Sequence, residues 1–197
     1  SGVGALTLVD HDTVGLTNLN RQVEATRSTL GQPKAQAMAD RIRDINPDGR
    51  LTIRAEKYEA GRREDFFDQP QDYIVDCIDL VSCKLDLIET ALTRGVPIVS
   101  SLGTGNKLDP TLLQVTDISK TYGCPLARVV RKELRARGIL HHRVLWSPEE
   151  PKAALQREAP PPGRRSVPAS NPWVPATAGL LLGSAVVRDL IAQVSLP

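Results

Sequence analysis

Polar side chains crowd into one short segment near the start of the sequence. The stretch from Asp10 to Gln22 reads DHDTVGLTNLNRQ and directly follows the apolar run ALTLV. It holds carboxylates, amides and an arginine, which bind ligands through directed hydrogen bonds. A plain surface loop has no need of so many such groups. The segment is therefore a candidate ligand site at the end of a strand.

The types of these residues suit a nucleotide. Asp10 ends a strand predicted over 6–10, where a carboxylate is placed to accept hydrogen bonds from ribose hydroxyls. Arg21 and Lys34 supply positive charge for phosphates, the first as a planar fork and the second as a point charge. Asp79 follows the apolar run YIVDCI, and Mg²⁺ prefers one or two carboxylates together with phosphate oxygens and water. The alternative for Asp10 and Asp79 is that each caps the helix that follows.

These residues need a scaffold of alternating strands and helices. Apolar runs predict strands over 6–10, 51–54, 73–79, 96–101 and 112–118, and helical spacing predicts helices over 31–47, 82–95 and 173–197, with a short one around 66–67. This alternation predicts an α/β fold with a mainly parallel, Rossmann-like sheet and flanking helices. In such sheets ligands lie beyond the carboxyl ends of the strands, where Asp10 and Asp79 both fall.

Length and composition fit one domain. The chain has 197 residues, of which 41% are apolar and 24% charged. We expect a single domain over 1–197, with a proline-rich mobile loop over 147–172 and a C-terminal docking helix over 173–197. The apolar part of that helix is interrupted by Arg188 and Asp189 and is shorter than the roughly 20 residues of a membrane span, so no integral membrane segment is expected.

A basic stripe is the candidate nucleic-acid surface. The net charge is only +2, so such a surface must be a local patch. Within PLARVVRKELRARG, the i, i+3, i+4 and i+7 positions are all basic and share one helical face: Arg128, Arg131, Lys132 and Arg135. Arg137, His141, His142 and Arg143 extend this patch. Such a stripe would contact phosphates without regard to sequence, and the alternative is an ordinary solvated helix face.

The cysteines and histidines predict neither a metal site nor a nucleophile. The sequence has no CxxC pair, which argues against a zinc site and favours a reducing cytoplasm. Cys77 lies in an apolar strand and is expected to be a buried core residue. Cys83 and Cys124 stand at predicted helix starts and are given no catalytic role. The adjacent His141 and His142 lack a third ligand at suitable spacing, so we expect them on the surface.

Three motifs in this order resemble the ubiquitin-activating-like adenylating enzymes of the ThiF/MoeB type. They are LTLVDHDTVGLTNLNRQ, GQPKAQAMADRIRDINP and DYIVDCID. The resemblance implies an ATP site with Mg²⁺. It places Asp10, with Asp12 beside it, at the ribose and Asp79 at the metal. The remaining site residues would face or support the triphosphate: Asn18, Arg21, Gln22 and Lys34. Arg21, Lys34 and Asp79 would be the catalytic ones.

Two later segments resemble one branch of that superfamily, the tRNA threonylcarbamoyladenosine dehydratases. They begin SSLGTGNKLDPTLLQVTDISK and NPWVPATAGLLLGSAVVRDL. The branch implies adenylation of the threonyl carboxylate by ATP, followed by ring closure with loss of water. It also implies a cytoplasmic homodimer, a tRNA partner and a sulfur-transfer system as a further partner. The family's first β-α unit and glycine-rich ATP loop would precede Ser1, so we expect the 197 residues alone to be weakly active or inactive.

Three other functions compete with this interpretation. Adenylation of a ubiquitin-like sulfur carrier would usually come with zinc-binding CxxC pairs. A non-catalytic remnant would bind tRNA or a protein without ATP chemistry. A dehydrogenase would need a dinucleotide-binding glycine motif, which this sequence lacks.

Overall fold

The computed structural model describes residues 1–153 and 169–193. Its contacts divide the chain into two compact units, Ser1–Phe66 and Phe67–Pro197, and each is described by itself. Most of the predicted proline-rich loop over 147–172 lies outside the described residues. The single domain expected over 1–197 stays a prediction.

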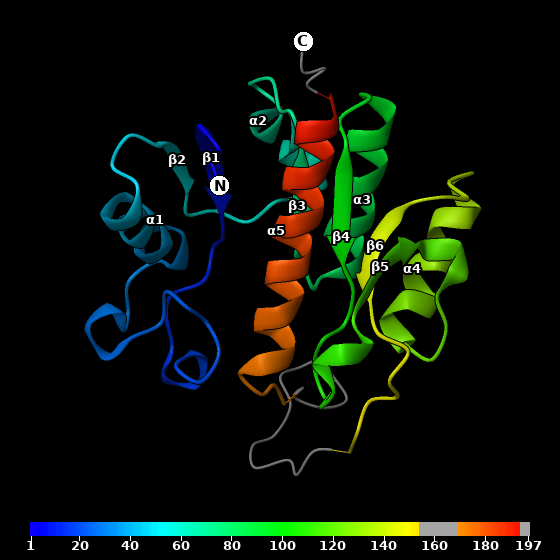
Figure 1. The fold of residues 1–197 in the computed structure, drawn as a ribbon. Helices are drawn as coiled ribbons and strands as arrows, with labels where there is room; N and C mark the ends of the chain where they lie inside the picture. The colour runs from blue at the N-terminus through cyan, green and yellow to red at the C-terminus, as the bar shows by residue number, and fades with distance from the viewer. Residues whose placement is uncertain (154–168, 194–197) are drawn as a thin grey trace. The chain divides into compact units, whose positions relative to one another are not determined.

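The first unit is a two-stranded parallel sheet with one main helix (Figure 1). β1 (Ala5–Val9) pairs with β2 (Arg50–Arg54) in parallel. α1 (Lys34–Ile45) packs against both strands. The buried residues of α1 are alanines, which let the helix approach the sheet closely: Ala35, Ala37 and Ala39. Short helical turns complete the unit: η1 (Leu16–Asn18), η2 (Arg27–Thr29), η3 (Ala60–Arg62) and α2 (Arg63–Phe66).

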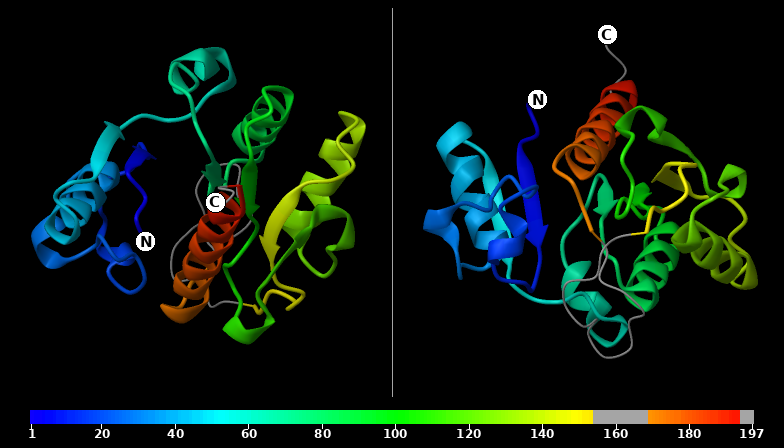
Figure 2. Two further views of the ribbon diagram at one scale, coloured as in Figure 1. Left: turned by 45° about the horizontal axis from the view of Figure 1, so that its top comes forward. Right: turned by 90° about the horizontal axis from the view of Figure 1, so that it is seen from below.

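The second unit is a four-stranded sheet in the order β3-β4-β6-β5. β3 (Ile74–Asp76), β4 (Ile98–Ser101) and β6 (Arg143–Trp146) run parallel, and β5 (Gln114–Asp117) is antiparallel to β6. In Figure 2, α5 (Trp173–Gln193) lies on one side of this sheet, and α3 (Val81–Thr93) and α4 (Pro125–Ala136) lie on the other. The turns η4 (Pro110–Leu112) and η5 (Ile118–Lys120) flank β5. The predicted mainly parallel α/β fold is confirmed.

α5 packs on the second unit's sheet through one face. Val174, Ala178 and Leu182 form a buried cluster with residues of β4 and β6, namely Val99 and Leu145. Near the other end of the helix, Asp189 accepts a hydrogen bond from Tyr73 Oη at 2.8 Å and pairs with Arg143. These contacts hold α5 on the sheet of its own unit, and the docking helix expected over 173–197 stays a prediction.

The length argument against a membrane span was wrong for α5. The helix has 21 residues, and by length and composition alone it is apolar enough to cross a membrane. This is weak evidence for a span, because core helices of globular proteins pass the same test.

Candidate functional site

The loop between β1 and α1 closes on itself through backbone hydrogen bonds. Val14 N donates to Gln32 O at 2.8 Å, and Gly31 N donates back to Val14 O at 2.9 Å. Inside this closure a small apolar cluster forms from Val14, Leu19, Ala25 and Ala37. The loop is therefore a packed structure, able to hold its polar side chains in fixed directions.

Asn18 belongs to the framework of this loop. Its side chain is buried, and its Oδ1 accepts a hydrogen bond from Gly15 N at 2.8 Å. Gly15 precedes η1, so Asn18 caps the turn that starts the NLNRQ segment. Asn18 was predicted to face a ligand, and its side chain stabilises the loop as well.

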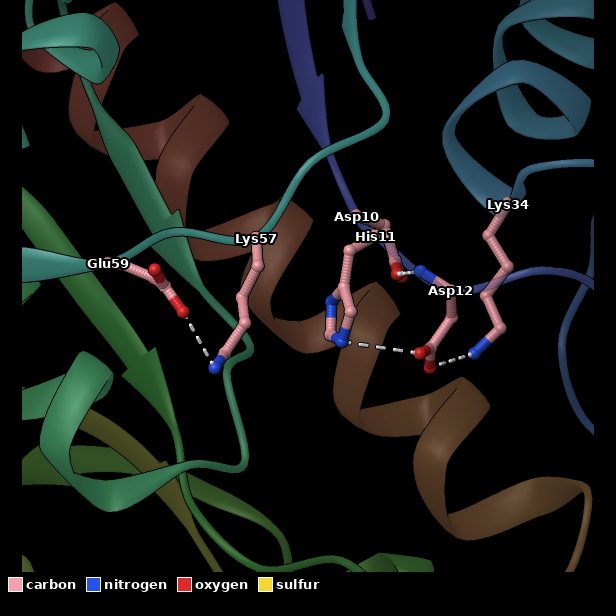
Figure 3. A network of polar contacts seen from close by, with 6 residues as sticks. All are labelled: Asp10, His11, Asp12, Lys34, Lys57 and Glu59. Carbon is pink, nitrogen blue, oxygen red and sulfur yellow. Dashed lines mark hydrogen bonds and ion pairs between the residues drawn. The ribbon is translucent and has the colours of Figure 1, made fainter. Parts of the chain in front are cut away.

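Four residues of the first unit meet where β1 ends and α1 begins (Figure 3). Lys34 is the first residue of α1, and its Nζ donates to Asp12 Oδ2 at 2.9 Å. Asp10 Oδ1 accepts from the Asp12 backbone N at 2.8 Å, and His11 Nε2 lies 3.5 Å from Asp12 Oδ1. The hydrogen bond from Lys34 lowers the pKa of Asp12, so Asp12 is ionised at neutral pH.

Arg21 and Gln22 follow on the same loop. Arg21 Nη1 donates to Thr17 O at 2.7 Å and to Asn20 Oδ1 at 3.0 Å, which fixes the direction of the guanidinium. Gln22 Oε1 is buried and accepts no hydrogen bond within the described part of the chain. Six of the predicted residues thus lie in the first unit, on the loop between β1 and α1 or at the start of α1: Asp10, Asp12, Asn18, Arg21, Gln22 and Lys34. Hydrogen bonds link Asp10 to Asp12 and Asp12 to Lys34, whereas Asn18 and Arg21 contact their own segment.

Asp79 lies in the second unit and is described within that unit alone. It is exposed in the loop between β3 and α3. Neither of the two aspartates stands at the N-cap position that the alternative proposed, because the N-cap residue of α3 is Leu80 and that of α1 is Pro33. An exposed carboxylate beyond the end of a parallel strand fits the donor that Mg²⁺ takes beside phosphate oxygens.

The sequence argument missed a buried ion pair next to Asp79. Asp76 ends β3, and its Oδ2 lies 2.6 Å from Lys84 Nζ, with neither side chain exposed. One signal in the sequence is Asp76, an acid inside the apolar run YIVDCI. No local pattern marks Lys84, which is buried in α3 together with the charged Asp86.

The basic face of α4 is divided between solvent and structure. Arg128, Lys132 and Arg135 are exposed, as predicted for a surface that contacts phosphates. Arg131 is half-buried, and its Nη1 donates to Thr121 O and Thr121 Oγ1, both at 2.6 Å. Arg131 therefore fastens α4 to the end of η5, and three residues of the stripe face solvent.

Two surface assignments are corrected. His142 was expected on the surface but is 4% exposed, and its Nε2 lies 2.8 Å from Ser100 Oγ. Burial lowers the pKa of His142 from 6.5 to about 4, so the imidazole is neutral at physiological pH. Cys77 was expected to be buried but is exposed, because Asp76 occupies the inward position at the end of β3.

The second part of the predicted basic patch is weaker than the sequence indicated. Arg143 pairs with Asp189 and Arg137 pairs with Glu89. His141 remains exposed, with its Nδ1 at 3.4 Å from Asp117 Oδ2. Carboxylates thus partner both arginines, so the basic surface centres on α4.

Comparisons with known proteins bear on these sites. The profile of the ThiF family matches residues 1–192. A tRNA threonylcarbamoyladenosine dehydratase of Bacillus subtilis is 42% identical over 205 aligned positions, which cover 100% of this chain and 81% of that protein. A tRNA threonylcarbamoyladenosine dehydratase of Escherichia coli is 40% identical over 69% of this chain and 51% of its own length.

The fold also matches a solved structure with a nucleotide. The E. coli tRNA N6-threonylcarbamoyladenosine dehydratase in complex with ATP superposes with a TM-score of 0.86 at 33% sequence identity. The match covers 98% of this chain and 77% of that one.

Proposed function

This chain belongs to the ThiF family, and from that premise we propose that it catalyses the ATP-dependent dehydration of threonylcarbamoyladenosine in tRNA. The observation that carries the proposal is the similarity of the full chain, at 42% identity, to an enzyme of that name. The similarity to an ATP complex over 98% of the chain supports ATP as the cosubstrate. The packed polar loop supplies groups of the kind that such a reaction needs.

Activation by ATP explains why the reaction needs a nucleotide. A carboxylate is a poor electrophile, and transfer of AMP to the threonyl carboxylate creates a good leaving group. Attack of the threonyl carboxylate on the α-phosphate of ATP releases pyrophosphate. Negative charge therefore builds up on the phosphates in the transition state. Arg21 and Lys34 are the residues that we propose to stabilise this charge.

The other residues of the first unit bind or support the nucleotide in this proposal. Asp10 accepts hydrogen bonds from the ribose hydroxyls, and Asp12 orients Lys34 through their 2.9 Å contact. Asn18 and Gln22 hold the loop. The buried Gln22 Oε1, which has no partner within the described residues, gives the loop an acceptor for an N–H of the ligand or for an O–H of water.

Mg²⁺ is proposed at Asp79, whose exposed carboxylate would hold the ion beside the phosphates. The metal would supply charge neutralisation for the phosphate oxygens. Within the first unit, Asp10, His11 and Asp12 also offer ligand atoms within 4.8 Å of one another. Because Asp12 already pairs with Lys34, that group is better suited to orienting the lysine.

The tRNA would bind along the exposed face of α4. Arg128, Lys132 and Arg135 are placed to contact phosphates, which gives affinity and orientation and leaves recognition of the modified nucleoside to the catalytic site. We further propose a homodimer in the cytoplasm and a sulfur-transfer system as a possible additional partner. The homodimer, the cytoplasmic location and the sulfur-transfer partner rest on the resemblance to the dehydratase branch.

The products of ATP test this function. Phosphorus NMR would follow ATP incubated with Mg²⁺, tRNA bearing threonylcarbamoyladenosine and the chain extended by any coding sequence that precedes Ser1. It should show AMP and pyrophosphate, and only when that tRNA is present. Formation of ADP and phosphate would contradict adenylation. AMP formation that requires a ubiquitin-like carrier protein in place of tRNA would favour the rival function.

A further inference from the structure

A buried ion pair lies behind the loop that carries Asp79. Asp76 is the last residue of β3, and Lys84 lies in the first turn of α3. Lys84 Nζ donates to Asp76 Oδ2 at 2.6 Å, and both side chains are 0% exposed. Because neither charge reaches the surface, any effect on a ligand must pass through other residues.

Each partner makes a second contact that leads away from the pair. Asp76 Oδ1 accepts a hydrogen bond from the backbone N of Ile78 at 2.9 Å. Lys84 Nζ donates to the backbone O of Ser101, the last residue of β4, at 3.0 Å. The pair therefore ties the β3–α3 loop, the start of α3 and the end of β4 to one another.

Stability alone does not account for this arrangement. Removing two charges from water offsets much of their mutual attraction, and apolar pairs of similar volume often stabilise a protein as well or better. An apolar pair could not accept the Ile78 N–H or donate to Ser101 O. What the charges add is a fixed position for the loop.

We infer that Asp76 and Lys84 are positioning residues that hold the Asp79 carboxylate where it binds Mg²⁺ and the nucleotide. The inference rests on the proposed function and deepens it. Ile78 directly precedes Asp79, so fixing the Ile78 amide limits the directions that the Asp79 side chain can take. A misplacement of about 1 Å at a reacting group lowers a rate on the order of 100-fold.

The first test replaces the pair by apolar residues of similar size. The double variant Asp76→Leu/Lys84→Met should keep a melting temperature close to that of the wild type. Its kcat should fall at least about tenfold, and the Mg²⁺ concentration for half-maximal activity should rise by about as much. The matched control is Glu89→Gln/Arg137→Gln, which removes an exposed ion pair between α3 and the residue that follows α4, and it should leave both values unchanged.

A second variant separates the loop contact from the pair. Ile78→Pro removes the N–H that Asp76 accepts and leaves both charges in place. It should raise the Mg²⁺ requirement as the double variant does. If the double variant does not fold, Ile78→Pro decides the question alone, and a wild-type Mg²⁺ requirement in a folded variant overturns the inference.

Two readouts are independent of dehydration. In the nucleotide-free wild type, hydrogen exchange at the Ile78 amide should be slow for a loop, and Asp76→Leu/Lys84→Met should speed it up. Binding of Mn²⁺ to the protein with ATP, followed by electron paramagnetic resonance, should weaken about tenfold in both variants. If the wild type binds Mn²⁺ and ATP but dehydrates no tRNA, the proposed function fails, while the Mn²⁺ affinities still test the inference. Equal affinities in wild type and variants, or no Mn²⁺ binding by any of them, overturn it.

Discussion

Lys34 stands at the start of a helix and carries a positive charge suited to a phosphate. As the first residue of α1 it lies at the positive end of the helix dipole, and its side chain is only 11% exposed beside Asp12. Both features concentrate positive charge where the polar loop meets the helix. A phosphate placed there would meet a charge that is already oriented, which lowers the reorganisation needed during the reaction.

Replacing this lysine tests its role at the nucleotide. Lys34→Gln should lower kcat/KM for ATP by about 100-fold, the loss typical of one charge-stabilising donor. Unfolding free energy should change by less than about 1 kcal/mol, because the Lys34–Asp12 pair is partly exposed. Arg43→Gln, which breaks the Arg43–Asp40 pair farther along α1, is the control and should retain wild-type kcat/KM. A Lys34→Gln enzyme with unchanged kcat/KM would contradict the assignment.

His142 should make stability depend on pH. Its folded pKa, about 4, lies below the unfolded value of 6.5, so the unfolded chain binds the proton more readily between these values. The favourable neutral state is present above pH 6.5 and is lost as the pH falls toward 4. The shift predicts a loss of about 2 kcal/mol in unfolding free energy between pH 7 and pH 5.

Denaturant titrations at the two pH values measure this loss. His142→Gln removes the titrating group, so the variant should lose correspondingly less stability over the same interval. The carboxylates contribute equally to the pH dependence of the wild type and of the variant. The difference between the two proteins in lost unfolding free energy is therefore specific to His142. An identical pH dependence in both would rule out the buried neutral histidine.

The polar residues that follow the strands could be recognised from the sequence. Which polar side chains are buried could not be predicted from it. The acids and basic residues of the loop over 10–22 stand out in the sequence because nothing around them needs so much polarity. His142 and Lys84 look like surface residues by type. Only the packing of α3 and the sheet encloses them, and no local pattern reports that.

At the scale of elements, α5 shows how a mostly apolar helix has two different sides. Leu182 is 3% exposed inside the cluster with Val99 and Leu145, whereas Leu180, two positions earlier, is 76% exposed. The same substitution at the two positions therefore distinguishes the effect of lost buried packing on stability from the effect of removing a leucine side chain from the helix.

Leu182→Ala should lower the unfolding free energy by about 3 kcal/mol, since it removes buried methyl groups and leaves a cavity. Leu180→Ala should change it by less than about 0.5 kcal/mol, as expected of an exposed position. Chemical denaturation of both variants provides the measurement. Similar losses from the two substitutions would mean that α5 does not dock through the face that carries Leu182.

The exposed basic face of α4 should govern the salt dependence of tRNA binding. Replacing Arg128, Lys132 and Arg135 by Gln should lower the slope of log Kd against log salt by about 2 to 3, because fewer counterions are released. The control replaces three exposed arginines of the first unit by Gln: Arg41, Arg43 and Arg50. Unchanged salt dependence in the α4 variant, or an equal change in the control, would mean that tRNA does not bind along this face of α4.

Strands and helices with strong patterns were predicted close to their observed bounds, as for α1 and β2. β6 was missed because RVLW is too short to stand out, and it becomes a strand only by pairing with β4 and β5. Arg131 shows the same limit on a helix. Its place on the basic face follows from spacing, but its hydrogen bonds to Thr121 depend on how the chain folds back.

At the scale of the whole molecule, two sets of residues serve one proposed reaction. The first unit carries the polar loop with Arg21 and Lys34, and the second carries Asp79, its buried support and the basic face of α4. The resemblance of the motifs assigned Arg21 and Lys34 to the phosphates and Asp79 to Mg²⁺, within an expected single domain, and these assignments stay predictions. How the charges are held, above all by Asp76 and Lys84, needed the structure, because ion pairs between an apolar strand and a helix leave little trace in a sequence.

Nucleoside mass analysis shows directly whether the protein dehydrates threonylcarbamoyladenosine in tRNA. tRNA bearing threonylcarbamoyladenosine would be incubated with ATP and Mg²⁺ and either the 197-residue chain or the chain extended by any coding sequence that precedes Ser1. We expect the modified nucleoside to lose one water, only with ATP, and Lys34→Gln to slow this loss. A nucleoside of unchanged mass with both proteins would contradict the proposed dehydration.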